Sequence, residues 1–129
     1  MTKTFRYVVP FVMSVFLSLG SGLSVAAETA QVLSENEAFD LLIQTIQHDT
    51  LYSSWTTIGC LRFLREETTT TYVDIAIHEK HEGLCPGDPN TAPVVDRFRV
   101  LRLMKKIMWY DVVNGEYVAY ERIRRQRRN

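Results

Sequence analysis

The chain has 129 residues, of which 15 are lysine or arginine and 15 are aspartate or glutamate, so its formal net charge is zero. This length leaves room for one domain with a modest hydrophobic core. Together with the lack of internal repeats, it excludes multi-domain and repeat architectures.

The first 27 residues have the pattern of an export signal. Lys3 and Arg6 form a short cationic start, residues 7 to 25 form an uncharged apolar run, and small residues follow. We expect cleavage before Glu28, which predicts a periplasmic or secreted mature protein. An uncleaved membrane anchor is the alternative, because an apolar run of this length can span a bilayer.

A helix is predicted from about residue 35 to residue 48. Ser34-Glu35-Asn36-Glu37 has the form of a capping box, in which the Ser34 hydroxyl accepts from the Glu37 amide and Glu37 reaches back. Beyond it, apolar residues recur at helical spacing, namely Ala38, Phe39, Leu42, Ile43 and Ile46. His48 and the Asp49-Thr50 pair mark the expected end of this helix.

After this helix the pattern changes to the two-residue alternation of β-strands. Five strands are predicted, over residues 57–66, 69–79, 94–103, 107–113 and 116–121. A hairpin turn is expected at residues 66–68, and Asn114-Gly115 is a strong turn signal because both residues tolerate positive φ. The last strand is expected to be a short edge strand.

The sequence therefore predicts an α+β fold in which one N-terminal helix packs on an antiparallel sheet of four to five strands. The face expected to cover the helix carries Leu61, Phe63, Val73, Ile75, Ile77, Phe98 and Val100. The domain is expected to occupy residues 28–121, after a signal peptide over 1–27 and before an Arg-rich tail over 122–129.

The charge of the expected mature chain is unevenly distributed. Residues 28–121 contain 8 basic and 15 acidic residues, a formal charge of −7, whereas five arginines crowd residues 122–129. This tail is predicted to be a disordered, solubilising extension. The alternative is a docking element for an anionic envelope surface or an acidic partner. Export argues against nucleic acid as its target.

Cys60 and Cys85 are the two cysteines of the chain. Two thiols in a small exported domain most often form one disulfide, since that compartment is oxidising, and we predict a bridge between Cys60 and Cys85. A metal-thiolate pair is the competing interpretation, although neither cysteine lies in the close pairs that zinc usually needs.

Residues 78–93 form the most unusual segment, because they contain two histidines, three prolines and two glycines. Proline lacks the ladder donor and restricts the residue before it, so the segment is not expected to continue a strand. Asp88 and Asn90 are typical turn residues. Two interpretations stay open, a rigid connection pinned by the disulfide or a preorganised recognition loop.

His78 and His81 are candidate metal ligands, and Asp74 is a candidate for orienting His78. Residues three apart on a strand point to opposite faces, so the two imidazoles are expected to diverge. The sequence shows no serine in a nucleophile elbow and no glycine-rich phosphate loop. We therefore predict no catalytic set, no metal and no cofactor, and keep metal binding through His78 and His81 as an alternative.

The sheet face turned away from the helix is a candidate binding surface. It is predicted to show Arg62, Tyr72, Asp74, His78, Arg97 and Arg99, with Trp109 or Tyr110 nearby. Aromatic residues and arginine dominate the energetics of protein interfaces. An ordinary solvated face with cross-strand ion pairs, such as Asp74 with Arg97, is the alternative. The predicted binding residues are His78, His81, Asp88, Arg97, Arg99 and Trp109.

Two resemblances are carried by these segments. The stretch EKHEGLCPGDPNTAPVVDRFRV, residues 79–100, resembles a Cys-x-Gly-Asp-Pro-x-Thr-x-Pro signature in small, mostly uncharacterised exported proteins of Gram-negative bacteria. A helix followed by a meander, with FRVLRLMKKIMWYD near the end, is similar to PepSY-like and cystatin-like domains. The second resemblance implies binding or inhibition of peptidases or other proteins, without catalysis.

Taken together, these features predict a periplasmic domain that binds another macromolecule. Its expected partner is a protein of the cell envelope, and its expected role is inhibition of an envelope hydrolase or peptidase. A structural accessory of an envelope assembly, docked through the Arg-rich tail, is the first alternative. A metal-binding protein that uses His78 and His81 is the second. The oligomeric state is left open.

Overall fold

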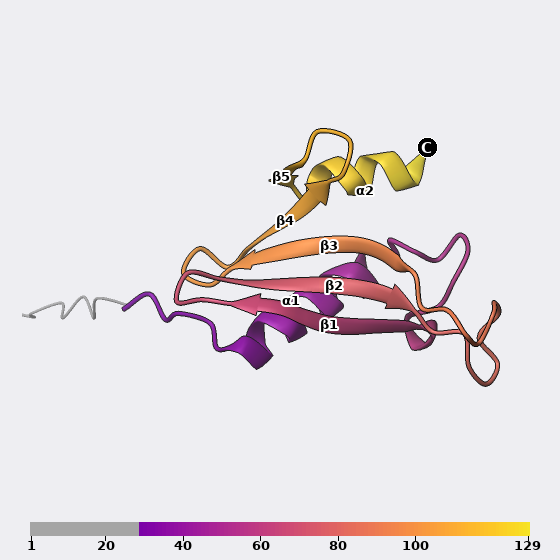
Figure 1. Cartoon of the computed structure of the whole chain (residues 1–129). Helices are drawn as coiled ribbons and strands as arrows, with labels where there is room; N and C mark the ends of the chain where they lie inside the picture. Colours follow the sequence, from indigo (N-terminus) through magenta and orange to yellow (C-terminus); the bar gives the residue numbers. More distant parts are fainter. Residues whose placement is uncertain (1–28) are drawn as a thin grey trace, which may run out of the picture.

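A computed structural model describes residues 29–129 of the chain, and Figure 1 shows how its helices and sheet are arranged. The expected export signal over residues 1–27 lies outside the described residues. The elements are, in order, α1 (Glu35–His48), η1 (Ile58–Cys60), β1 (Leu61–Thr68), β2 (Tyr72–Glu79), β3 (Val94–Leu101), β4 (Lys106–Asp111), β5 (Glu116–Ala119) and α2 (Glu121–Arg128). Within residues 29–129, no helix has the length and apolar character needed to cross a bilayer.

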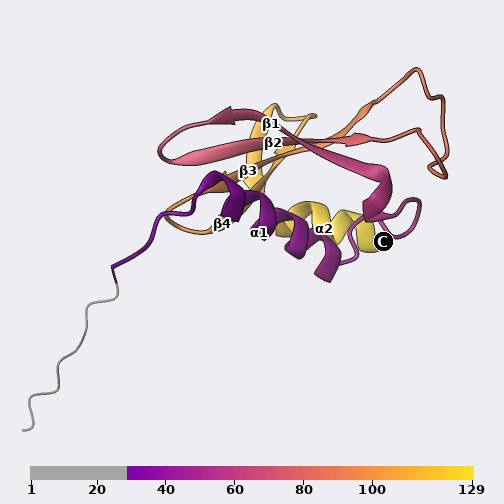
Figure 2. The same ribbon diagram turned by 90° about the horizontal axis from the view of Figure 1, so that it is seen from below.

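The strands form one antiparallel sheet in the order β1-β2-β3-β4-β5, so each strand pairs with the next one along the chain. Both helices lie on the same face of this sheet, as Figure 2 shows. The predicted α+β class, with an N-terminal helix on an antiparallel sheet, is confirmed. The second helix was not predicted.

Helix α1 begins where the capping box predicts. The Glu37 amide donates to the Ser34 hydroxyl at 3.2 Å, and the Ser34 amide donates to the Glu37 carboxylate at 2.7 Å. These two bonds satisfy amides that the first helical turn leaves unpaired. One stripe of the helix is then buried against the sheet, at Ala38, Leu42 and Ile46.

The turn between β1 and β2 lies at residues 69–71, so the turn predicted at residues 66–68 is wrong. The β1 ladder continues past Glu66 through an irregularity between Arg65 and Glu67. The turn is stabilised by the Thr69 hydroxyl, which accepts from the amides of Thr71 and Tyr72 at 3.2 and 3.1 Å. Because the Thr69 hydroxyl accepts in place of a backbone carbonyl, it favours a turn at residues 69–71 over one at residues 66–68.

The core lies between the inner face of the sheet and the two helices. Its largest fully buried side chains are Phe98, Leu42, Ile75, Ile77, Ile123, Val73 and Val100. Truncation of a buried aromatic side chain such as Phe98 to alanine removes apolar contacts and leaves a cavity, at a cost of about 3–5 kcal/mol. Because the two helices share the inner face, the outer face of the sheet stays uncovered by the described elements.

Residues 121–128 form helix α2, so the prediction of a disordered tail is wrong. Ile123 is 1% exposed and belongs to the core. Directly before the helix, the ring centroid of Tyr120 lies 6.1 Å from that of Phe98. Two apolar anchors are therefore enough to hold an arginine-rich segment against the sheet, and composition alone conceals them.

Three arginines of α2 pair with carboxylates whose side chains are less than a tenth exposed. The pairs are Arg122 with Asp111 at 3.5 Å, Arg124 with Asp49 at 3.7 Å and Arg127 with Asp96 at 3.2 Å. The arginines of these pairs stay 35–45% exposed, so solvent screens the attraction, but each pair ties α2 to a carboxylate of the domain. Three of the five arginines over residues 122–129 are thus paired with carboxylates of the domain itself.

Candidate functional site

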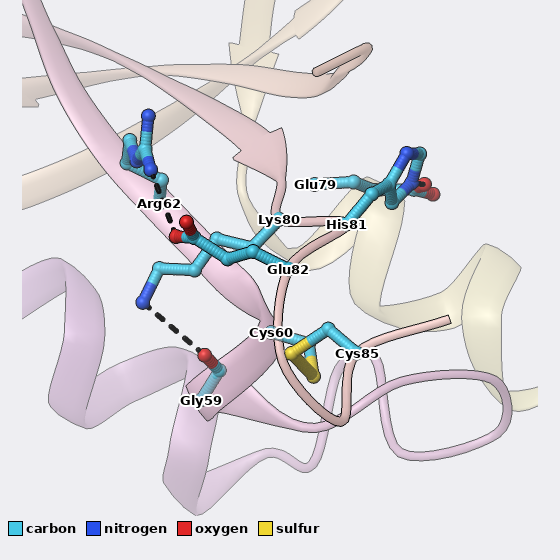
Figure 3. Close-up of a disulfide and its surroundings, with 8 residues drawn as sticks. All are labelled: Gly59, Cys60, Arg62, Glu79, Lys80, His81, Glu82 and Cys85. Atoms are coloured by element: carbon cyan, nitrogen blue, oxygen red, sulfur yellow. Dashed lines mark hydrogen bonds and ion pairs between the residues drawn. A yellow bond between two sulfur atoms is a disulfide. The ribbon is translucent and has the colours of Figure 1, made fainter. Parts of the chain in front are cut away.

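The disulfide predicted from the sequence is present, and the Cα atoms of Cys60 and Cys85 are 5.4 Å apart. It joins the end of η1, directly before β1, to the loop that follows β2, and Figure 3 shows its surroundings. The Lys80 amide also donates to the Cys60 carbonyl at 2.8 Å, and the Lys80 ammonium donates to the Gly59 carbonyl at 3.3 Å. The stapled loop, residues 80–93, is therefore fixed to the sheet at its base.

His81 organises the interior of the stapled loop, with only 9% of its side chain exposed. Its Nδ1 lies 2.9 Å from the Asp88 carbonyl and 3.1 Å from the Thr91 hydroxyl, and its Nε2 pairs with the Glu79 carboxylate. Carbonyl and carboxylate oxygens only accept, so both ring nitrogens donate in the favoured imidazolium form. The hydrogen bond to Glu79, and next the one to the Asp88 carbonyl, raise the pKa of His81 above its usual value.

Gly87 and Asp88 complete this arrangement. Gly87 has a φ of 122°, and a Cβ at this position would overlap the His81 ring, so glycine lets the ring lie against the backbone. The Asp88 carboxylate accepts from the Asn90 amide at 2.9 Å and from the Asn90 side chain at 3.1 Å. Asp88, predicted as a binding residue, therefore shapes the loop through its side chain and its carbonyl.

His78 lies at the other edge of the same loop. Its Nδ1 is 2.9 Å from the Ala92 carbonyl oxygen, which makes that carbonyl, and not Asp74, its hydrogen-bond partner. The hypothesis that Asp74 orients His78 is therefore wrong. Within residues 29–129, no group of three or more His, Cys, Asp or Glu side chains is placed to hold a metal ion. His78, like His81, ties a strand end to the loop.

Arg99 is the centre of the outer sheet face. Its guanidinium makes two hydrogen bonds of 2.7 Å to the two carboxylate oxygens of Asp74. The ion pair of Asp74 with Arg97, an example of the alternative of an ordinary solvated face, is therefore not formed. The Arg99 guanidinium also lies 3.7 Å from the ring centroid of Tyr72 and 4.3 Å from that of Tyr117. Asp74 is directly opposite Arg99 in the β2–β3 ladder, which accounts for this partner. The two rings clamp the cation, and Asp74 holds it charged.

Further contacts extend this cluster across the outer face. The Tyr72 hydroxyl donates to Glu67 at 2.9 Å, and this bond raises the pKa of Tyr72. The Tyr117 ring centroid is 5.2 Å from that of Tyr110, and burial raises the pKa of Tyr117 to about 12. We define the tyrosine–arginine face as Glu66, Glu67, Tyr72, Asp74, Arg97, Arg99, Tyr110 and Tyr117.

Arg97 lies at the exposed part of this face, and its Nε donates to the Glu66 carboxylate at 2.9 Å. Its side chain is 38% exposed, compared with 27% for Arg99. Arg97 is therefore the more accessible of the two predicted arginines. The sequence prediction did not include Tyr117. The Asn114-Gly115 hairpin could have indicated it, because the return strand places Tyr117 opposite Tyr110.

Trp109 does not belong to the outer face, so its predicted place in the binding surface is wrong. It is opposite Phe98 in the β3–β4 ladder and is 8% exposed in the core. Its indole nitrogen donates to Asp96 at 2.8 Å, and the Tyr52 hydroxyl donates to the same carboxylate at 2.8 Å. The sequence left open whether Trp109 or Tyr110 lies on the outer face, and the strand's register places Tyr110 there and Trp109 in the core.

The predicted binding residues are thus divided among three places. His78, His81 and Asp88 hold the stapled loop, Arg97 and Arg99 lie on the tyrosine–arginine face, and Trp109 lies in the core. The resemblances to exported proteins and to PepSY-like and cystatin-like domains stay predictions. No protein-family model, no curated protein and no solved structure matches the chain.

Proposed function

We propose that the chain is an exported binding domain of the cell envelope, whose protein partner contacts the tyrosine–arginine face. The observation that supports this most is the division of the sheet into two faces. Both helices cover one face, and the other carries the Arg99 cluster with its tyrosines. The resemblance to cystatin-like domains implies an envelope hydrolase or peptidase as the partner, with inhibition as the consequence.

Preorganisation is the physical support for a protein-binding role. The rings of Tyr72 and Tyr117 are held on either side of Arg99, and Glu67 fixes the Tyr72 hydroxyl. Side chains already held in one geometry lose little conformational entropy on binding. Tyrosine and arginine also contribute most often to interface hot spots. The face therefore combines the residue types and the rigidity that favour a protein interface.

The charges of the face favour a protein over a polyanion. Arg99 is paired with Asp74, and Arg97 is paired with Glu66. Nucleic acid gains affinity from arginines that can exchange counterions for phosphates. On this face a nucleic acid would meet the carboxylates of Asp74 and Glu66, which already pair with the arginines and would repel its phosphates. A protein surface of mixed charge, with apolar contacts to the rings, fits this pattern better.

The two alternatives have weaker support. Metal binding by both histidines would require His81, whose two ring nitrogens both have oxygen partners, to exchange one of these partners for a metal. Docking through the arginines of α2 would compete with ion pairs to three buried carboxylates. Both functions would disturb contacts that stabilise the fold, whereas a partner on the outer face would not.

Affinity capture from cross-linked envelopes tests the proposal. The full chain, tagged after Asn129, would be compared with Tyr110→Ala and Arg97→Ala on the face and with Arg125→Ala as the control. Arg125 is exposed on α2, so its replacement removes the same charge elsewhere. We expect one hydrolase or peptidase at near-equal amount with the unchanged chain and with Arg125→Ala. The purified partner should bind the two face variants at least about tenfold more weakly, the effect of one hot-spot residue.

Equal affinity of all variants for the captured protein would contradict a role of this face. Capture that depends on Arg125 but not on Tyr110 would instead support the accessory role. Thermal unfolding of each variant separates a lost contact from a lost fold. This check matters most for Tyr110→Ala, because Tyr110 is half-buried against Tyr117.

A further inference from the structure

The end of the sheet opposite the stapled loop exposes an apolar surface. Leu103 and Met104, in the turn between β3 and β4, are 56% and 68% exposed, and the adjacent Val32 is 45% exposed. They border a recess of about 440 Å³. We define the apolar end by the residues that line this recess, namely Val32, Thr70, Thr71, Leu101, Leu103 and Met104.

Hydrogen bonds around Arg102 make this end rigid. The Arg102 side chain donates to the Leu33 carbonyl at 2.7 Å and to the Thr69 carbonyl at 2.5 Å. In the backbone, the Leu33 amide donates to the Arg102 carbonyl at 3.1 Å, and the Arg102 amide donates to the Thr71 carbonyl at 2.9 Å. Three chain segments are thus joined at one arginine. The exposed apolar side chains are held outward by this framework.

Two cations accompany the apolar side chains. Lys105 and Lys106 follow Met104 directly, and both are exposed. An apolar tip next to lysines is complementary to the bilayer interface, where apolar groups reach the acyl boundary and ammonium groups meet phosphates. This combination distinguishes the β3–β4 turn from the β4–β5 turn, where Val112 and Val113 are exposed without adjacent lysines.

The course of the chain brings this end close to the expected membrane segment. The described chain begins at Thr29, and Figure 1 shows residues 29–33 beside the β1–β2 and β3–β4 turns. The uncharged apolar run over residues 7–25 ends shortly before them. An extended chain covers at most ~3.6 Å per residue, so residues 26–32 span no more than about 25 Å. Whenever the apolar run lies in a membrane, as a signal or as an anchor, the apolar end is within reach of its surface.

We propose that the apolar end is a membrane-contact surface for bilayers with anionic phospholipids. Leu103 and Met104 enter the interface, while Lys105 and Lys106 bind headgroup phosphates. This contact orients the sheet with its stapled loop away from the bilayer. The inference does not depend on the proposed protein partner, because the tyrosine–arginine face takes no part in it.

Amine labelling of the full chain tests the contact. The chain would be reconstituted in vesicles of phosphatidylcholine with phosphatidylglycerol, in vesicles of phosphatidylcholine alone, and in buffer without lipid. Labelling of each lysine by a membrane-impermeant acylating reagent would be followed by mass spectrometry. Lys80, in the stapled loop, is the internal control. We expect labelling of Lys105 and Lys106 to slow by about fivefold or more on the anionic vesicles, and labelling of Lys80 to stay unchanged.

Two variants identify the side chains responsible. Replacement of Leu103 and Met104 by glutamine should remove the protection, whereas replacement of Val112 and Val113 by glutamine should leave it intact. Unchanged labelling of Lys105 and Lys106 on vesicles would overturn the proposal. Protection that is already present without lipid and grows with protein concentration would also overturn it, in favour of a second copy of the chain. Equal protection on both vesicle types would overturn the role of the lysines.

Discussion

The two ends of the sheet are built from different interactions. At the stapled end, a disulfide and the polar contacts of His81 and Asp88 hold the loop, although Leu84 within it is fully exposed. At the apolar end, one arginine holds the backbone, and the side chains of Leu103 and Met104 point outward without burial. Polar groups that hydrogen-bond to each other stabilise the fold. Exposed apolar side chains on a rigid backbone can instead bind a partner or a membrane.

Of the changes that compare the two ends, removal of the disulfide is expected to have the largest effect. Replacement of both Cys60 and Cys85 by serine frees a loop of 25 residues and should lower the free energy of unfolding by roughly 3 kcal/mol. Urea unfolding of the variant and the unchanged chain measures this difference. A loss below about 1 kcal/mol would mean that the hydrogen bonds of the loop, and not the disulfide, stabilise this end.

Gly87→Ala tests whether the loop needs the His81 ring in its place. The variant places a Cβ in the ring at a φ of 122°, and we expect a loss of about 1–3 kcal/mol. Gly83→Ala is the matched control. Gly83 has a φ of 63°, but a Cβ there meets nothing within 4 Å, so only the backbone cost of about 1 kcal/mol is expected. Equal losses for the two variants, measured by urea unfolding, would show that the ring contact is unimportant.

The protonation of His81 should make the stapled end pH-dependent. Its pKa is raised in the folded state, mainly by Glu79, so folding favours the bound proton. The stabilisation is complete below the unfolded pKa of about 6.5 and is lost as the pH rises through the higher folded pKa. The free energy of unfolding of the unchanged chain should therefore fall over this window, and His81→Gln should remove that part of the fall. His48→Gln, at an exposed histidine, serves as the control. A pH profile that His81→Gln leaves unaltered would argue against this role.

The smallest effect on folding is expected at the apolar end. Replacement of Leu103 and Met104 by glutamine should change the free energy of unfolding by less than about 0.5 kcal/mol, because neither side chain is buried. The same variant should lose the lysine protection on vesicles. A loss of 2 kcal/mol or more, of the size seen when buried leucines are truncated, would place these residues in the core and remove the contrast between the ends.

The order of elements was largely predictable because its signals are local. The capping box at Ser34 and the apolar period after it gave the bounds of α1. Strand alternation gave the inward set around Ile75 and Phe98. The Asn114-Gly115 signal placed the last hairpin, in which Gly115 has a φ of 70°. The first hairpin turn was misplaced, because the Thr69 hydroxyl accepts from two amides of the turn and fixes it at residues 69–71.

The candidate site was less predictable because it depends on register. Pairing of Asp74 with Arg99 instead of Arg97 follows from the β2–β3 ladder. The burial of Trp109 follows from the β3–β4 ladder. A shift of one residue reverses which side chains share a face, and alternation within a single strand does not specify its partner. Tyr117 lies opposite Tyr110 across the local β4–β5 hairpin, and its contact with Arg99 of β3 depends on the packing of non-adjacent strands.

The sequence by itself determined the α+β class, the first helix and the Cys60–Cys85 pair, because these follow from spacing, caps and a count of two thiols. Only the tertiary structure decided that residues 121–128 are helical. Their isoleucine and three of their arginines are stabilised by core side chains and carboxylates far away in the sequence. It also decided which side chains meet on the outer face. Local patterns record the energetics of neighbours in sequence, whereas these contacts depend on which segments pack together.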